Sequence, residues 1–102
     1  MRPYQLTLSA EGDLREIIRY TLETWGEQQA LHYAGMLEKR FYEIASKTAI
    51  VWNFSNRYPE VMVNRCEHHY IFYIASPSQK PSIFAILHER MDLLQRLKDR
   101  LG

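Results

Sequence analysis

The sequence is poor in the features that mark many functional classes. Its 102 residues include one cysteine, Cys66, so an intrachain disulfide is impossible and a secreted, disulfide-stapled design is excluded. No basic N-terminal region precedes a long apolar core, and no apolar run approaches the length needed to span a bilayer. The four glycines are isolated, which excludes a glycine-rich phosphate-binding loop. We therefore expect a cytoplasmic protein.

The composition indicates a small folded domain. Hydrophobic residues make up 46% of the chain, and seven Tyr, four Phe and two Trp give it a high aromatic content for its size. A chain of this length can build one modest core but not a core and a deep enclosed cleft. We therefore expect residues 1–102 to form a single domain whose function lies on its surface.

The net charge of +1 hides an asymmetry between the two halves. Residues 9–46 hold seven acidic and four basic side chains, a net charge of −3, whereas residues 47–102 hold eight basic and five acidic ones, a net charge of +3. The second half could therefore face an acidic partner, although solvated helix faces also produce differences of this size.

Two long helical patterns dominate the first half. Tyr4–Leu8 alternates weakly and predicts a short edge strand, and Ser9 is the predicted N-cap of a first helix. Apolar residues recur at helical spacing as far as Trp25, where Gly26 can adopt the positive φ that ends a helix. A second apolar stripe runs over Ala30–Ala45. With only a glycine-centred turn between them, the two helices should form an antiparallel hairpin.

The second half reads as a small sheet. His69–Ala75 and Ser82–Asp92 are rich in aromatic and β-branched residues, and the turn Ser76–Pro81 separates them, which predicts a strand hairpin apolar on both faces. Val61–Cys66 resumes extended character. These three segments predict a three-stranded antiparallel meander that the N-terminal strand can join. Such strands need cover on both faces, which the helices must supply.

Two further segments complete an α+β fold. Lys47–Pro59 mixes apolar residues with loop formers, and we predict a loop anchored by Trp52 and Phe54. Asp92 should cap a short C-terminal helix. The residues expected to face inward on that helix are Leu93, Leu94, Leu97 and Leu101. The core residues expected between helices and sheet are Leu14, Ile17, Ile18, Leu37, Phe41, Phe72, Ile86 and Leu97.

Catalytic and metal-binding patterns are weak. His68 and His69 are adjacent on a predicted strand and so point to opposite faces, and His32 has no partner at i+4, so no metal or cofactor site is expected. Cys66 and the serines form no nucleophile arrangement. Metal-free RNA cleavage remains open, because it needs a base, an acid and cations on one patch. Neighbouring strands could supply Arg65, His69, Tyr73, His88 and Arg90.

The basic C-terminal helix could also be read as a nucleic-acid face. Glu89, Asp92 and Asp99 lie among its basic residues and weaken the positive field, and no exposed aromatics for base stacking are evident beside it. We therefore expect protein binding, and no sequence-specific nucleic-acid binding by this chain alone.

Several short segments, in order and at the right spacing, carry a family resemblance. They are Leu6–Ala10, Asp13–Ile17 with Tyr20, Trp25–Gly26 with Gln29–Ala30 and Tyr33, Tyr70–Tyr73, and Ile86–Asp92. Together they resemble the ParE branch of the ParE/RelE toxin superfamily. Ser46–Phe54 departs from the Asn-Pro and Gly-Arg segment usual in that family. The ribonuclease branch carries Lys and Arg on the sheet and Tyr or His near its C-terminus, whereas here His69–Ala75 has no Lys or Arg and no Tyr or His follows Asp92.

The resemblance implies a type II toxin that poisons DNA gyrase by binding, without chemistry, and that a ParD-like antitoxin neutralises. A RelE-like, ribosome-dependent mRNA endoribonuclease is the alternative, and a small α+β module with another protein partner is a third interpretation. We predict target-binding residues in the strand-to-helix region, on charge and exposure: His88, Arg90, Met91, Arg96, Lys98 and Arg100. We predict antitoxin-binding residues on central-strand aromatic surface left open by the helices: Tyr70, Phe72, Tyr73 and Phe84.

Overall fold

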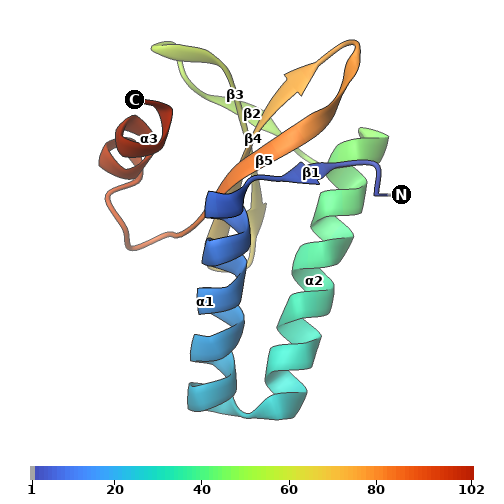
Figure 1. Cartoon of the computed structure of the whole chain (residues 1–102), viewed down its shortest axis with the longest axis vertical. Helices are drawn as coiled ribbons and strands as arrows, with labels where there is room; N and C mark the ends of the chain where they lie inside the picture. The colour runs from blue at the N-terminus through green and yellow to red at the C-terminus, as the bar shows by residue number, and fades with distance from the viewer. Residues whose placement is uncertain (1) are drawn as a thin grey trace.

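The computed structural model describes residues 2–102. Along the chain, a short strand is followed by two helices, four strands and a last helix (Figure 1). No helix in these residues is both long enough and apolar enough to cross a membrane. The elements in chain order are β1 (Gln5–Leu6), α1 (Leu8–Trp25), α2 (Glu27–Ser46), β2 (Trp52–Ser55), β3 (Tyr58–Cys66), β4 (His69–Ser76), β5 (Gln79–His88) and α3 (Leu93–Leu101).

The helical hairpin forms as its sequence predicts, except at its start. Thr7, not Ser9, caps α1: its backbone is extended, and its hydroxyl accepts a hydrogen bond from the Ala10 N–H at 3.1 Å. The predicted cap was two residues late because a serine inside the first turn was mistaken for the boundary. Gly26 has φ 96° and joins α1 directly to α2, which confirms the predicted turn.

The sheet is larger than the predicted meander. Its five strands have the order β1-β5-β4-β3-β2. Strands β2, β3, β4 and β5 pair with one another in antiparallel fashion, and β1 pairs with β5 in parallel. The α+β class is confirmed. The prediction of a loop over Lys47–Pro59 is wrong at both Trp52 and Phe54, because they lie on β2, which pairs with β3. The β4–β5 strands also extend further than predicted, so that only Pro77 and Ser78 form the turn.

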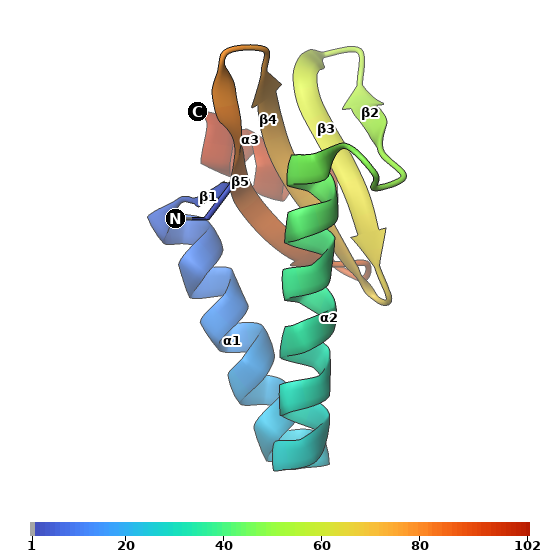
Figure 2. The same cartoon turned by 90° about the vertical axis from the view of Figure 1, so that its right-hand side faces the viewer.

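Helices cover both faces of the sheet, and each covered face has its own core (Figure 2). The α1–α2 hairpin lies on one face, where α2 stands in front of the strands in Figure 2, and α3 lies behind them. Of the predicted core, five side chains are buried, and the three on α1 are only half-buried. The buried five are Leu37, Phe41, Phe72, Ile86 and Leu97, and the half-buried three are Leu14, Ile17 and Ile18.

The C-terminal helix α3 begins where the sequence predicts. The Asp92 carboxylate accepts the Gln95 N–H at 3.2 Å and so caps the helix. Leu97 is fully buried, but Leu94 is 41% exposed, so the prediction that Leu94 faces inward is wrong. A helix of nine residues presents one narrow stripe to the sheet, and Leu94 lies outside that stripe.

Candidate functional site

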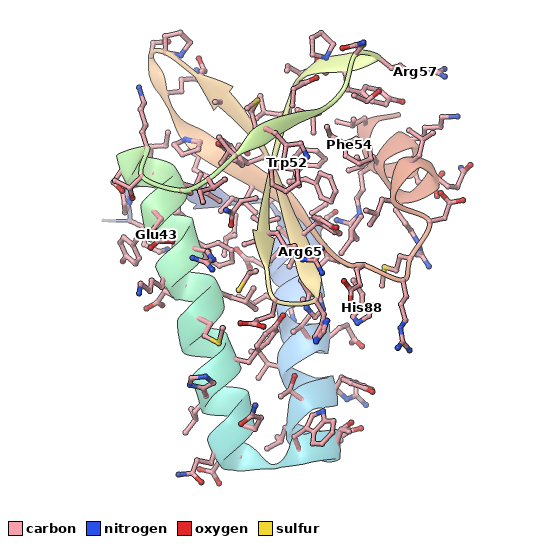
Figure 3. The ribbon with its side chains drawn as sticks, turned by 180° about the vertical axis from the view of Figure 1, so that it is seen from behind. Glu43, Trp52, Phe54, Arg57, Arg65 and His88 are labelled. Atoms are coloured by element: carbon pink, nitrogen blue, oxygen red, sulfur yellow. The ribbon has the colours of Figure 1, made fainter. Side chains whose placement is uncertain are left out.

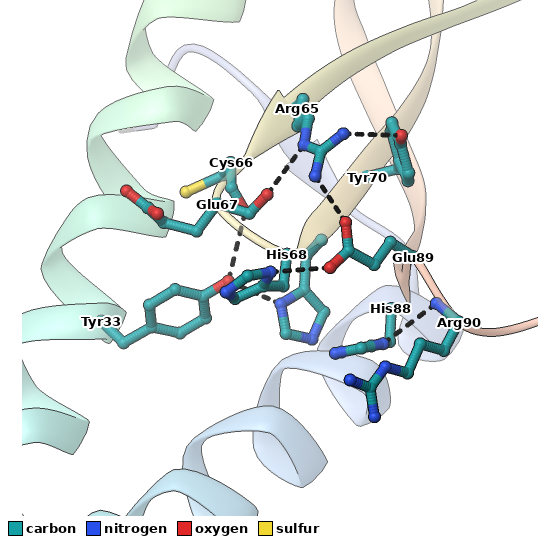
Figure 4. A network of polar contacts seen from close by, with 10 residues as sticks. Tyr33, Arg65, Cys66, Glu67, His68, Tyr70, His88, Glu89 and Arg90 are labelled. Carbon is teal, nitrogen blue, oxygen red and sulfur yellow. Dashed lines mark hydrogen bonds and ion pairs between the residues drawn. The ribbon is translucent and has the colours of Figure 1, made fainter.

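Polar side chains from α2, the β3–β4 turn and the end of β5 meet at one end of the sheet (Figure 4). His68 lies in the two-residue turn between β3 and β4, not on a strand as predicted, and this placement lets both neighbouring histidines reach the same region. We call this group the histidine cluster. Its members are Tyr33, Arg65, His68, His69, His88 and Glu89.

Glu89 holds the outer part of the cluster together. Its carboxylate accepts the Arg65 guanidinium at 2.5 Å through one oxygen and His68 Nδ1–H at 2.7 Å through the other. Hydrogen bonding to His68, assisted by the charge of Arg65, lowers the pKa of Glu89. Arg65 also donates to the Glu67 carbonyl at 2.9 Å and to the Tyr70 hydroxyl at 3.0 Å. Each of the three guanidinium nitrogens of this arginine thus has one partner in the protein.

The inner part of the cluster is a tyrosine–histidine pair. The Tyr33 hydroxyl lies 2.5 Å from His69 Nδ1 and 3.2 Å from the Cys66 carbonyl oxygen. A carbonyl can only accept, so both contacts are satisfied when Tyr33 donates to Cys66 and His69 Nδ1–H donates to Tyr33. Burial, with the nearby His88 and His68, lowers the pKa of His69 to about 4, and the ring is therefore neutral at pH 7.

His88 closes the cluster from β5. Its ring centroid lies 5.1 Å from that of His69 in an edge-to-face arrangement and 6.3 Å from that of His68 in a stacked one. His88 Nδ1 accepts the backbone N–H of Arg90 at 3.1 Å. This bond fixes the turn that leads from β5 towards α3. Nδ1 of His88 is therefore occupied and cannot accept a proton from a substrate in this arrangement.

Four of the five candidates for RNA cleavage come together here, but Tyr73 does not. Arg65, His69, His88 and Arg90 lie at this end of the sheet, whereas Tyr73 is 6% exposed in the core beneath the helices. Within residues 2–102 no three His, Cys, Asp or Glu side chains are arranged to hold a metal ion. The cluster ties α2, β3, β4 and β5 to one another, and most of its polar atoms are already bound inside the protein.

The predicted target-binding residues divide into exposed and internal groups. Arg90, Met91 and Arg96 are exposed around the start of α3, and His88 and Lys98 are half-buried. Arg100 is not available. Its guanidinium binds Asp13 on α1 at 2.6 Å and donates to the Phe84 carbonyl at 2.8 Å.

The Arg100–Asp13 pair closes an edge of the sheet. Strand β1 pairs only with Ser82 and Ile83 of β5, so the edge of β5 after Ile83 has no neighbouring strand. There Arg100 donates to the Phe84 carbonyl, and the Ile86 N–H donates to Asp13 at 2.9 Å. The prediction that Arg100 faces outward was wrong because sequence alone does not reveal that the last turn of α3 reaches this edge. Hydrogen bonding to Asp13 raises the pKa of the Arg100 guanidinium.

The expected open aromatic surface on the central strands is also not where it was predicted. Phe72 is fully buried, with the ring of Phe54 5.3 Å away, and Tyr73 and Phe84 are 6% and 8% exposed. Tyr70 is half-buried and lies under Arg65, whose guanidinium carbon is 5.2 Å from its ring centroid. Phe72 is covered because the unpredicted strand β2 places Phe54, labelled in Figure 3, against it, and Tyr73 lies in the core under the helical hairpin.

Sequence reasoning missed two parts of the cluster. Tyr33 and Glu89 looked like ordinary residues of a helix and a strand end, because their partners lie 36 and 21 residues away along the chain.

The strand β2 did have a local signal, the period-two alternation of Trp52 and Phe54 with Asn53 and Ser55.

Comparison with known proteins gives one consistent result. Residues 4–93 match the family model described as ParE toxin of type II toxin-antitoxin system, parDE. The chain is 44% identical over 101 residues to a protein named Toxin ParE from Escherichia coli, covering 99% of this chain and 98% of that protein. It is 30% identical over 94 residues to Toxin ParE1 from Caulobacter vibrioides, covering 90% of this chain and 94% of that relative.

Proposed function

The chain belongs to the ParE toxin family of type II toxin–antitoxin systems, and on that premise we propose that it arrests growth by binding and poisoning DNA gyrase. A toxin of such a pair has an antitoxin partner, and we propose a ParD-like protein that neutralises it in the cytoplasm. No cofactor takes part. The observation that carries the proposal is similarity to Toxin ParE along nearly the whole of both chains.

The surface proposed for the target is the strand-to-helix region. Arg90, Met91 and Arg96 are exposed there, with Met91 42% exposed, and His88 lies at its border. A large apolar side chain among exposed cations is the composition found in protein interfaces that recognise an acidic partner. Lys98 is half-buried and belongs to the border of this surface, and Arg100 is removed from it because it binds Asp13.

Binding without chemistry also agrees with the state of the histidine cluster. A histidine that acts as a general base needs a free ring nitrogen and a pKa near the working pH. The pKa of His69 is about 4 and its Nδ1 contacts Tyr33, while Glu89 neutralises Arg65. Groups engaged in this way are better suited to holding the fold than to proton transfer.

The RelE-like ribonuclease remains a second candidate, because one observation favours it. Arg65 and His69, on either side of the β3–β4 turn, lie at the same end of the sheet as His88 from β5. A ribonuclease would use them on RNA bound at this end of the sheet. The two functions differ in what they require of these side chains, so they can be separated by mutation.

The test uses purified gyrase with supercoiled and relaxed plasmid DNA. We expect the parent protein to inhibit supercoiling and to increase double-strand breaks, and the Arg90→Glu/Arg96→Glu variant to lose at least about tenfold in potency, because cations at an interface rim govern association with an acidic partner. Arg15→Glu/Arg19→Glu, two exposed arginines on α1, is the charge-matched control and should keep full potency.

The ribonuclease arm measures cleavage of ribosome-bound messenger RNA with the same proteins. We expect none from the parent. Codon-dependent cleavage that His88→Ala or Arg65→Ala reduces by about 100-fold or more, as removal of a catalytic acid or base does, would replace the gyrase proposal with the second candidate.

A further inference from the structure

An apolar groove lies at the end of the sheet opposite the histidine cluster. It has a volume of about 640 Å³ and is bounded by the end of α2, the segment leading to β2, and the β4–β5 hairpin. Its lining is mainly apolar. Its apolar lining includes Ile44, Val51, Met62, Tyr73, Ala75 and Pro81.

The groove exists because the helix stops before the sheet does. Helix α2 ends at Ser46, and Lys47 adopts a left-handed backbone with φ 63° that turns the chain away. Strands β4 and β5 continue past this point and project beyond the end of α2 (Figure 2). The sheet face under their tip therefore has no helix over it.

The groove wall next to α2 is held in place by backbone hydrogen bonds. The N–H groups of Thr48 and Ala49 both donate to the Glu43 carbonyl, at 2.9 and 3.2 Å. These bonds fix the turn after α2. They hold Ala49, which lines the groove, close to the end of the helix.

The charges at the groove all have one sign. The ionisable side chains with a formal charge that line it are Lys47 and Lys80, both exposed, and no carboxylate of residues 2–102 lines it. A second, shallower hollow shares Pro3 and Ala45 with the groove and adds Lys39. Glu43 also borders that hollow, but its carboxylate binds Arg40 at 3.0 Å.

We propose that this groove is the docking site for an apolar segment of the antitoxin whose flanking residues are acidic. Apolar side chains of the segment lie on the floor made by Met62, Tyr73 and Ala75, and its carboxylates meet Lys47 and Lys80. The inference rests on the proposed function, since it assigns the antitoxin partner to a surface. It retains Tyr73 from the predicted antitoxin-binding residues, because Tyr73 lines the groove, and it removes Phe72 and Phe84, which do not.

The experiment measures binding of the full-length antitoxin encoded beside this gene to variants of the whole chain, by calorimetry at two salt concentrations. Lys47→Glu/Lys80→Glu reverses the groove charges, and Ala75→Trp fills its floor at an exposed position. We expect each to weaken binding at least about tenfold, and the charge variant to lose the salt dependence seen in the parent. Arg15→Glu/Arg57→Glu, which reverses two exposed arginines outside the groove lining, is the charge-matched control and should bind like the parent.

Gyrase inhibition is measured on the same variants, so that failure of the inference and failure of the proposed function give different results. Weak antitoxin binding with normal gyrase inhibition supports the groove assignment. If neither the parent nor the variants inhibit gyrase but the groove variants bind the antitoxin weakly, the groove assignment is still supported, and only the proposal that gyrase is the target is contradicted. Parent-like antitoxin binding by both groove variants overturns the assignment, as does loss of gyrase inhibition with antitoxin binding intact. Melting curves establish that each variant is folded.

Discussion

The two ends of the sheet differ in whether their side chains are already bound within the protein. At the end with the β3–β4 turn, polar groups from α2, β3, β4 and β5 bind one another, with Glu89 between Arg65 and His68, and Tyr33 against His69. At the opposite end the strands run past α2, and an apolar floor stays open between two lysines. The first end can therefore stabilise the fold, whereas the second has surface left for a partner.

This difference predicts that mutations at the two ends affect different properties. A polar network resists change because each lost partner leaves another group unpaired. An open apolar surface contributes little to the folded chain by itself, and it gains energy only when a partner removes it from water. Stability should be sensitive at the cluster and partner binding at the groove.

The largest expected effect on stability comes from the core beside the cluster. Ile86, 2% exposed and opposite Ile71, should lose about 2–5 kcal/mol of unfolding free energy when truncated to Ala. Met62 on the floor of the groove is half-buried, and Met62→Ala should cost only about 1 kcal/mol. Urea denaturation measures both. Equal losses at the two sites would contradict the contrast between the ends.

The next largest effect is expected at the sheet edge closed by Arg100. Arg100→Ala leaves the Asp13 carboxylate and the Phe84 carbonyl without this partner, so we expect a loss of about 2–3 kcal/mol. Arg96→Ala on the exposed side of α3 is the control and should change stability by less than about 0.5 kcal/mol. If the two variants unfold at the same urea concentration, Arg100 does not hold α3 to the sheet.

A smaller loss is expected when the inner hydrogen bond of the cluster is removed. Tyr33→Phe keeps the ring but leaves His69 and the Cys66 carbonyl without the hydroxyl, at a cost of about 1–2 kcal/mol. Tyr42→Phe, on the exposed face of α2 beside the groove, should be neutral within about 0.5 kcal/mol. Thermal melts of the two variants compare a paired hydroxyl with an exposed one on the same helix.

The last contrast is a pH dependence to which the cluster contributes. The pKa of His69 is about 4 in the folded protein and 6.5 for the free side chain, so the unfolded chain binds a proton first as pH falls. The contribution of His69 to stability is therefore complete above pH 6.5 and is lost progressively towards pH 4. We expect the melting temperature of the parent to fall over this window, and that of His69→Gln to fall less. Parallel curves would show that His69 does not carry the dependence.

Local patterns made much of the fold predictable. The apolar spacing of α1 and α2, with Gly26 between them, depends only on neighbours within a few residues, and so does the Asp92 cap of α3. The strand β2 had a local signal too, the alternation of Trp52 and Phe54 with polar residues, but the loop formers around it favoured a different interpretation. The family resemblance read from short segments is confirmed by the whole-chain comparisons.

The tertiary structure alone decided which side chains remain on the surface. Apolar and charged residues can be read from the sequence, but whether Phe72 is covered depends on Phe54, and whether Arg100 is free depends on Asp13, 87 residues away. The same holds for the groove, which exists because α2 ends before β4 and β5 do. The sequence by itself determined the helices, most strands and the family, because these follow from periodicity and short-range order. The cluster and the groove follow from long-range packing, which brings together groups that no local pattern connects.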